Sequence, residues 1–74
     1  MSKSTLGIIG GGQLGSMLAI AANKLEIKTV VFSDDIYAPA QNFSNEFVHG
    51  QYDDQKKIDE FTKKADVILS LIHI

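Results

Sequence analysis

The chain has 74 residues and a mass of 8.1 kDa, which is the size of one small domain. Hydrophobic residues make up 45% of it, charged residues 22%, and there is one proline, so the composition excludes collagen-like, low-complexity and strongly disordered chains. A net charge of −2 leaves no basic surface for nucleic acid or an anionic membrane, and the lack of cysteine excludes disulfides, thiolate nucleophiles and cysteine zinc sites.

The first apolar run, residues 6–9, ends at three consecutive glycines and predicts a buried strand that leads into a tight turn. This run is too short for the core of a signal peptide, and a membrane span needs about 20 apolar residues. We therefore expect a cytoplasmic protein with neither a membrane nor a nucleic-acid partner.

An amphipathic helix is predicted from about Gln13 to Leu25. Its buried face is expected to consist of the apolar side chains that recur at helical spacing, Leu14, Met17, Leu18, Ala21, Ala22 and Leu25. Residues 28–32 are rich in β-branched and apolar side chains and predict a second buried strand. A strand, a helix and a strand within about 30 residues indicate a βαβ unit with parallel strands.

The second half of the chain continues this alternation. Residues 33–45 are polar and predict a loop with one helical turn, before a short third strand at residues 47–48. Asp53 or Asp54 is expected to cap a second helix. The apolar face of that helix carries Ile58, Phe61 and Ala65. Residues 67–69 then open a fourth strand.

The alternating elements predict an α/β fold, a Rossmann-like open parallel sheet with helices on both faces. The chain stops inside the apolar stretch of residues 67–74, which predicts an unprotected strand at the edge of the sheet. We therefore expect residues 1–74 to form a single, truncated domain, with a natural edge strand as the alternative.

Gly10, Gly12 and Gly15 match a G-x-G-x-x-G fingerprint between the first strand and the first helix. The first glycine permits a tight turn, the second lets the backbone approach an anion, and the third allows close packing of helix on strand. The start of the helix favours a phosphate through its free N–H groups and dipole. The motif does not choose a ligand, and the alternative is that these glycines only form the turn.

Other candidate residues have a structural explanation beside the functional one. Asp34, 24 positions after Gly10, stands where dinucleotide folds place a ribose-binding acid, but Asp34 and Asp35 also suit a solvated turn. We expect Asp53 and Asp54 to cap a helix rather than form a carboxylate pair. Further such residues are Tyr52 and Phe61, expected as core aromatics, His49 and His73, expected not to bind metal, and Lys56, Lys57, Lys63 and Lys64, expected as a solvated face.

Several segments resemble one family, the 5-(carboxyamino)imidazole ribonucleotide synthases, which belong to the ATP-grasp superfamily. Its opening loop is similar to residues 10–18, Gly-Gly-Gly-Gln-Leu-Gly-Ser-Met-Leu. Similar segments follow in order at residues 25–28, 38–40, 50–54 and 66–68, so that the resemblance covers nearly the whole chain. The Gln13-Leu14 pair and the Tyr52-Asp53-Asp54 segment make it more specific than the glycine fingerprint alone.

The resemblance implies a place in purine biosynthesis. Enzymes of this family use ATP and bicarbonate to carboxylate the amine of 5-aminoimidazole ribonucleotide, and their N-terminal domain forms one wall of the ribonucleotide site. By position, Gly11, Gly12, Gln13 and Leu14 would bind this substrate, with backbone N–H groups facing the phosphate and the Gln13 amide near the ribose. No residue of this chain matches a catalytic, cofactor-binding or metal-binding position, because ATP and magnesium bind to the family's ATP-grasp domain.

The chain also departs from the family pattern. Ser16 stands where the family has arginine, and residues 69–74 replace a Thr-Tyr-Glu-Phe-Glu-Asn segment that includes a substrate-site glutamate. This sudden loss of resemblance just before the end of the chain suggests a frameshifted or split gene. The ATP-grasp and C-terminal domains are absent, which predicts a chain that is inactive alone. A separately encoded ATP-grasp polypeptide would then be its partner. The alternatives are the nucleotide-binding half of an NAD-dependent oxidoreductase and a non-functional gene remnant.

Overall fold

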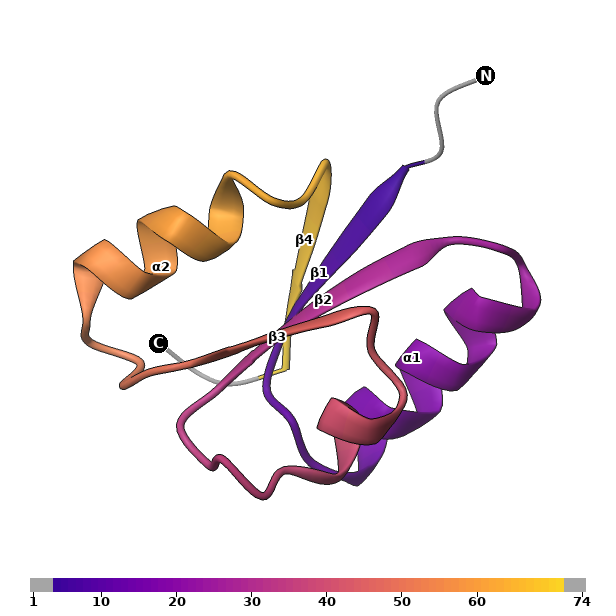
Figure 1. Cartoon of the computed structure of the whole chain (residues 1–74), viewed down its shortest axis with the longest axis horizontal. Helices are drawn as coiled ribbons and strands as arrows, with labels where there is room; N and C mark the ends of the chain where they lie inside the picture. Colours follow the sequence, from indigo (N-terminus) through magenta and orange to yellow (C-terminus); the bar gives the residue numbers. More distant parts are fainter. Residues whose placement is uncertain (1–3, 72–74) are drawn as a thin grey trace.

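The computed structural model describes residues 4–71 and contains a four-stranded sheet with helices (Figure 1). In chain order the elements are β1 (Thr5–Ile9), α1 (Gln13–Lys24), β2 (Lys28–Ser33), the 3-10 helix η1 (Pro39–Asn42), β3 (Glu46–His49), α2 (Gln55–Thr62) and β4 (Val67–Ser70). The predicted strands and the first helix are confirmed to within one residue at either end, and η1 is the helical turn expected in the loop. Part of the predicted last strand, residues 72–74 with His73, lies outside the described residues.

The sheet has the strand order β3-β2-β1-β4, and all neighbouring strands are parallel. In the centre, Gly7 on β1 is opposite Val30 on β2 and Ile68 on β4. The chain moves outward from β1 to β3 and then returns to the other side of β1. This is the order of the first half of a doubly wound sheet, so the predicted Rossmann-like α/β fold is confirmed.

Helices cover both faces of the sheet, with α1 on one side and α2 on the other (Figure 1). Two buried clusters correspond to these faces. The cluster under α1 and η1 consists of Ile8, Ala19, Val31 and Ala40. The cluster under α2 consists of Ile9, Val30, Phe32 and Phe61. Side chains alternate along each strand, so neighbouring residues of β1 and β2 enter opposite clusters.

The buried face of α1 differs from the predicted one. The helix buries Gly15, Ser16, Ala19 and Ala22 against the sheet. Of the expected residues, Ala22 is buried and Leu18 is half-buried, whereas Leu14, Met17, Ala21 and Leu25 are exposed. The reason is the close approach of the helix to the strand, which leaves room only for small side chains at the contact.

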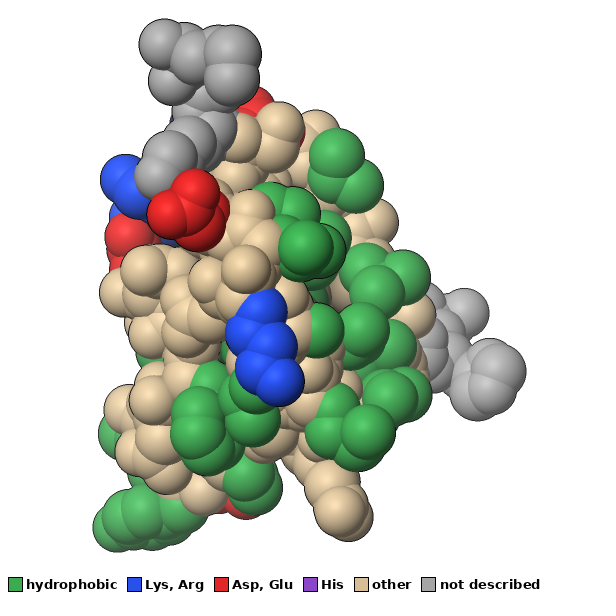
Figure 2. Space-filling view, turned by 90° about the vertical axis from the view of Figure 1, so that its right-hand side faces the viewer, with side chains coloured by type: hydrophobic (Ala, Val, Ile, Leu, Met, Phe, Trp, Pro, Cys, Tyr) green, Lys and Arg blue, Asp and Glu red, His purple; other side chains and the backbone are tan. Residues whose placement is uncertain are grey.

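The exposed apolar side chains of α1 form a second stripe along the helix. Leu14, Met17 and Leu25 are 56%, 59% and 71% exposed, respectively. Figure 2 views the side of the molecule on which α1 lies, and hydrophobic side chains gather on this surface. Helical spacing therefore identified an apolar stripe, but the larger side chains of that stripe face solvent in this structure.

The second helix is capped by Asp54 rather than Asp53. The Asp54 carboxylate accepts a hydrogen bond from the N–H of Lys57 at 3.3 Å, which satisfies one of the unbonded donors at the helix start. Phe61 is fully buried and lies edge-on to Phe32, with ring centroids 5.6 Å apart. The predicted cap and the predicted core role of Phe61 are both confirmed.

The end of α1 is closed by backbone hydrogen bonds around Glu26, which has a positive φ of 59°. The N–H of Glu26 donates to the carbonyl of Asn23 at 3.0 Å, and the N–H of Ile27 donates to the carbonyl of Ala22 at 2.9 Å. This is the Schellman pattern, in which glycine is the usual residue at the left-handed position. Glutamate at this position carries the steric penalty of the left-handed conformation.

Replacing Glu26 by glycine is expected to raise the free energy of unfolding by about 0.5–1 kcal/mol, because the relief of the left-handed conformation exceeds the entropy that glycine loses on folding. Ala21→Gly is the matched control, since Ala21 is exposed within the same helix. Its unfolding free energy should fall by about 1 kcal/mol. Urea unfolding of both variants measures the difference, and a loss of stability in Glu26→Gly would contradict the strain at this turn.

Lys64, which follows α2, forms an ion pair with Glu46 on β3, with 2.6 Å between the ammonium nitrogen and a carboxylate oxygen. The hydrogen bond that Lys64 donates to Glu46, followed by the negative charge of Glu46, raises the pKa of Lys64 above the ordinary 10.5. The two side chains remain 44% and 53% exposed, so the contribution of the pair to stability is small. Lys64 is thus more than the solvated residue that the sequence predicts.

The raised pKa of Lys64 gives the ion pair a defined pH dependence. Its stabilisation is fully present below about pH 10.5 and is lost as the pH rises through the folded-state pKa. We expect Glu46→Gln to remove this part of the decline in unfolding free energy between about pH 9 and pH 12. Glu60→Gln, which removes a weaker charge effect on Lys64, should change the decline less. Equal pH profiles for Glu46→Gln and the unsubstituted chain would refute the assignment.

Within residues 4–71, no helix is long and apolar enough to cross a membrane.

Candidate functional site

The glycine loop lies at the carboxyl end of β1, in the centre of the sheet. On one side of β1 the chain has proceeded through α1 to β2, and on the other side β4 runs alongside, so the strand order reverses at this point. The N–H of Leu71, just after β4, donates to the carbonyl of Ile9 at 2.9 Å and holds the two strand ends together. Open parallel sheets bind ligands at such a reversal, outside the carboxyl ends of the strands.

The structure explains two of the three fingerprint glycines, one by its backbone conformation and the other by the lack of room for a side chain. Gly10 has a φ of 117°, a conformation that other residues rarely adopt, and its N–H donates to the carbonyl of Phe32 at 2.8 Å. A Cβ atom on Gly15 would lie 2.4 Å from the carbonyl oxygen of Gly10. The predicted tight turn at Gly10 and the close helix–strand contact at Gly15 are therefore confirmed.

Gly12 differs from both, because no atom lies within 4 Å of the place where its Cβ would be. It is the N-cap residue of α1 and makes no side-chain cap. Among the described residues, none accepts a hydrogen bond from the backbone N–H groups of Gly11 through Gly15. The loop therefore presents free donors and the positive end of the α1 dipole to an open space.

That space is a cavity of about 290 Å³. It is lined by Gly10, Gly11, Gly12, Gln13, Leu14, Gly15, Tyr52 and Leu71. All four residues that the sequence analysis assigns to the substrate, Gly11, Gly12, Gln13 and Leu14, are thus brought together on one wall. Every lining residue is neutral, so the electrostatic attraction for an anion comes from the backbone donors and the helix dipole.

Tyr52 and Leu71 are the two lining residues that the sequence analysis does not assign to the site. Tyr52 follows the carboxyl end of β3, which lies beyond β2 in the sheet. Leu71 follows the carboxyl end of β4, which lies beside β1. Tyr52 is half-buried and packs against the cluster under α2, as expected for a core aromatic, but it also forms a wall of the cavity. The one signal for it in the sequence is its place a few residues after the predicted strand of residues 47–48.

Ser16, where the resembled family has arginine, is 7% exposed. Its hydroxyl donates to the carbonyl of Gly12 at 3.2 Å, and its N–H donates to the same carbonyl at 3.0 Å. This side chain stabilises the first turn of α1 and does not line the cavity. The loop of this chain therefore has a neutral hydroxyl in place of a cation.

Asp34 and Asp35 lie after β2 and outside the cavity. The Asp35 carboxylate accepts a hydrogen bond from the N–H of Tyr37 at 2.9 Å, which is the turn-forming role expected for these acids. Asp34 is exposed, and its backbone carbonyl lies 3.1 Å from Nε2 of His49. In residues 4–71, no three His, Cys, Asp or Glu side chains gather in a way that could hold a metal ion.

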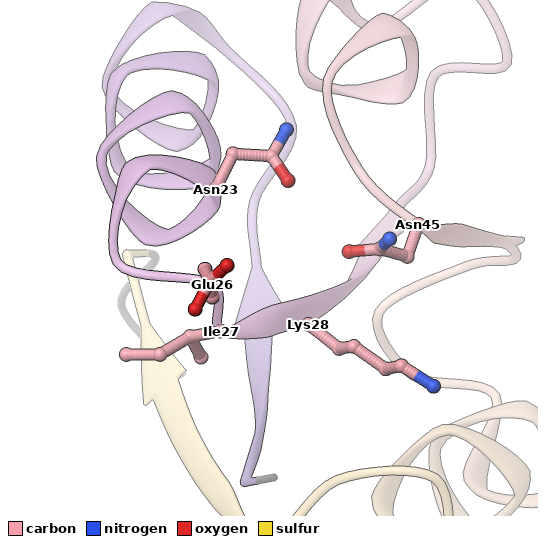
Figure 3. Close-up of a pocket in the computed structure, with 5 residues that line it drawn as sticks. All are labelled: Asn23, Glu26, Ile27, Lys28 and Asn45. Atoms are coloured by element: carbon pink, nitrogen blue, oxygen red, sulfur yellow. The ribbon is translucent and has the colours of Figure 1, made fainter.

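A second hollow of about 290 Å³ lies at the opposite end of the sheet (Figure 3). It is lined by Asn23, Glu26, Ile27, Lys28 and Asn45, where α1 ends and β2 begins. Asn45 holds the start of β2 by accepting a hydrogen bond from the N–H of Thr29 at 2.9 Å. In Figure 3 the Lys28 side chain points away from Asn23 and Glu26, so these polar groups do not converge. The glycine-loop cavity is therefore the better candidate.

A family model described as the ribonucleotide synthetase preATP-grasp domain matches residues 3–72 of the chain. The chain belongs to this family. The N5-carboxyaminoimidazole ribonucleotide synthase of Staphylococcus aureus is 43% identical to it over 65 residues, and that of Staphylococcus saprophyticus is 45% identical over 65 residues. Each alignment covers 88% of this chain and 17% of the relative.

Solved structures agree with the sequence relatives. The N5-carboxyaminoimidazole synthetase of Staphylococcus aureus, complexed with ADP, superposes with a TM-score of 0.88 at 42% identity, covering 90% of this chain and 18% of that one. The Thermotoga maritima synthetase gives a TM-score of 0.88 at 30% identity, covering 93% and 19%. The preATP-grasp chain thus spans less than a fifth of the length of the relatives that it matches.

These matches confirm the resemblance that the glycine loop and the Tyr52-Asp53-Asp54 segment indicate. The preATP-grasp chain is related to the carboxylating ligases of purine biosynthesis. The binding roles of Gly11, Gly12, Gln13 and Leu14, and the prediction that the domain is truncated, stay predictions.

Proposed function

We propose that the glycine loop binds the phosphorylated ribose of 5-aminoimidazole ribonucleotide, as the N-terminal part of a carboxylating ligase of purine biosynthesis in the cytoplasm. The observation that carries this proposal is the row of unbonded N–H groups from Gly11 to Gly15, which faces a cavity at the strand-order reversal. Phosphate oxygens only accept hydrogen bonds, and a helix start with free donors suits them.

The size of the cavity supports a fragment of a nucleotide rather than a whole one. Small-molecule sites commonly enclose about 300–1,000 Å³, so a cavity of about 290 Å³ lies just below this range. Backbone N–H groups in the row from Gly11 to Gly15 would hold the phosphate, and the exposed Gln13 amide would bond to the ribose. The aminoimidazole ring would extend beyond these residues, toward the part of the relatives that lies outside the aligned segment.

The carboxylation itself is assigned to that further polypeptide. The described residues include no cluster of three or more His, Cys, Asp or Glu side chains, and the side chains that line the cavity carry no positive charge to meet a triphosphate. No step with ATP or magnesium is therefore assigned to this chain. We propose that an ATP-grasp polypeptide binds both in the active complex.

The purified chain alone is accordingly expected to show no turnover. With 5-aminoimidazole ribonucleotide, ATP, magnesium and bicarbonate present, neither ADP nor carboxylated product should form above the rate of a protein-free control. A coupled ADP assay and chromatography of the product measure both. Activity that copurifies with the 74-residue chain and is lost in Gly12→Asp would contradict the proposal.

The NAD-dependent oxidoreductase is the competing interpretation of the same fingerprint. It needs Asp34 to bind a ribose, but Asp34 does not line the glycine-loop cavity, and the family match favours the ligase. Equilibrium dialysis against equal concentrations of 5-aminoimidazole ribonucleotide and NAD separates the two. We expect retention of the ribonucleotide; retention of NAD alone would reverse the assignment. If the chain instead shows no cooperative thermal transition, the interpretation as a non-functional remnant is favoured.

A further inference from the structure

We infer that the hydroxyl of Tyr52 is the side-chain donor that completes the phosphate site of the glycine-loop cavity. This inference rests on the proposed function and adds a second wall to the proposed binding site. The glycine loop supplies backbone donors from one side of the cavity, and Tyr52 lines the cavity from the segment after β3. A phosphorylated ribose would thus lie between main-chain N–H groups and a phenol.

The ring of Tyr52 is held in place by aromatic packing. Its centroid lies 5.9 Å from that of Phe32, with the planes tilted by 48°, and Phe32 in turn lies against Phe61. Phe32 and Phe61 are fully buried, so they form a rigid support behind the tyrosine. The orientation of the ring is therefore set by the core and does not depend on the hydroxyl.

The hydroxyl of Tyr52 has no partner within residues 4–71. No buried side-chain nitrogen or oxygen in this part of the chain lacks a hydrogen bond, so the phenol oxygen must be accessible from outside the protein. A half-buried tyrosine with its ring in the core and its hydroxyl unbonded has a donor available for a ligand.

The charge of the cavity makes this donor important. The lining residues are neutral, and Ser16, at the position of the family's arginine, turns its hydroxyl to the carbonyl of Gly12. A bound phosphate must therefore find all its hydrogen bonds among neutral donors. Gln13 and Tyr52 are the two lining side chains that can donate, and Gln13 is exposed whereas Tyr52 is fixed.

Tyr52→Phe tests the inference with little risk to the fold, because it keeps the ring against Phe32 and removes only the hydroxyl. Tyr37→Phe is the matched control, since Tyr37 is the other tyrosine of the chain, is 87% exposed and does not line the cavity. Amide NMR titrations with ribose 5-phosphate, and with ribose as the ligand without phosphate, give the dissociation constants.

We expect Tyr52→Phe to weaken binding of ribose 5-phosphate by about tenfold, as for the loss of a hydrogen bond to a charged group, while Tyr37→Phe changes it by less than about twofold. Binding of ribose should be weak and equal in all three proteins. Unchanged binding of ribose 5-phosphate in Tyr52→Phe would overturn the inference alone. If the unsubstituted chain binds neither ribose 5-phosphate nor 5-aminoimidazole ribonucleotide, the proposed function fails and the inference with it.

Discussion

Replacing Gly12 by aspartate is expected to abolish ligand binding while leaving the fold at least as stable. No atom lies within 4 Å of the position that the new Cβ would take. The backbone of Gly12, with φ −76° and ψ −159°, is extended, a conformation that any residue can adopt. As the N-cap residue, the aspartate would accept hydrogen bonds from the N–H groups of Leu14 or Gly15. Those are the donors that the account assigns to the phosphate.

The two effects of Gly12→Asp have opposite signs. Capping and the favourable charge at the helix start should raise the free energy of unfolding by about 0.3–1 kcal/mol. The occupied donors and the added negative charge should weaken binding of a phosphorylated ribose by about 100-fold or more. Urea unfolding and NMR titration of the same sample measure both quantities.

Gly12→Asn is the matched control for charge, because asparagine caps a helix about as well as aspartate. It should stabilise the chain similarly and weaken binding less than aspartate does. If Gly12→Asp binds ribose 5-phosphate as tightly as the unsubstituted chain, the phosphate does not lie at the start of α1. The natural glycine would then have no explanation in ligand binding.

Gly15→Ala is expected to have the largest effect on folding. The added Cβ would lie 2.4 Å from the carbonyl oxygen of Gly10, which is backbone and cannot rotate away. The helix must therefore move off the strand, which opens the contacts of Ala19 and Ala22 with the sheet. We expect a loss of about 3 kcal/mol or more in unfolding free energy, at the upper end of the cost of overpacking.

Such a loss is large for a domain of this size, since globular domains have about 0.05–0.15 kcal/mol of stability per residue. Thermal unfolding followed by circular dichroism measures it. Gly12→Ala is the control, because it adds the same methyl group three positions earlier into open space. Stabilities within about 0.5 kcal/mol of each other for the two alanine variants would contradict the close contact of α1 with β1.

The order and bounds of the elements could be predicted because local signals agree. The apolar run of residues 6–9 ends at glycines, residues 28–32 favour a strand, and Asp54 caps the helix that follows. Each signal acts within a few residues, so no tertiary contact is needed to interpret it. The parallel sheet then follows from the alternation of strands and helices.

The buried face of α1 could not be predicted in the same way. The helix has an apolar stripe of large side chains, which includes Leu14 and Met17, and a stripe of small ones, which includes Gly15 and Ala19. Helical periodicity fits both stripes, and hydrophobicity favours the larger residues. The small side chains are the buried ones because Gly15 lies against the carbonyl of Gly10. Residue propensities do not include such a contact between backbone groups.

The sequence predicts only one wall of the candidate site, the wall that the glycine fingerprint forms. Gly11 through Leu14 are consecutive and stand at a strand–helix junction, so their place follows from the fingerprint. Tyr52 and Leu71 enter the cavity from after β3 and β4 through the strand order β3-β2-β1-β4. Their approach depends on the topology of the sheet, which the spacing of residues along the chain does not express.

The central claim is that the backbone donors of the glycine loop bind the phosphate of 5-aminoimidazole ribonucleotide. An amide NMR titration of the ¹⁵N-labelled chain with this ribonucleotide tests it directly, with Gly12→Asp as the negative control. We expect the signals of Gly11, Gly12, Gln13 and Leu14 to shift most when the ribonucleotide is added, and the same addition to leave them in place in the variant. Shifts centred instead on Asn23, Glu26 and Asn45, or shifts of the loop that persist in Gly12→Asp, would contradict it.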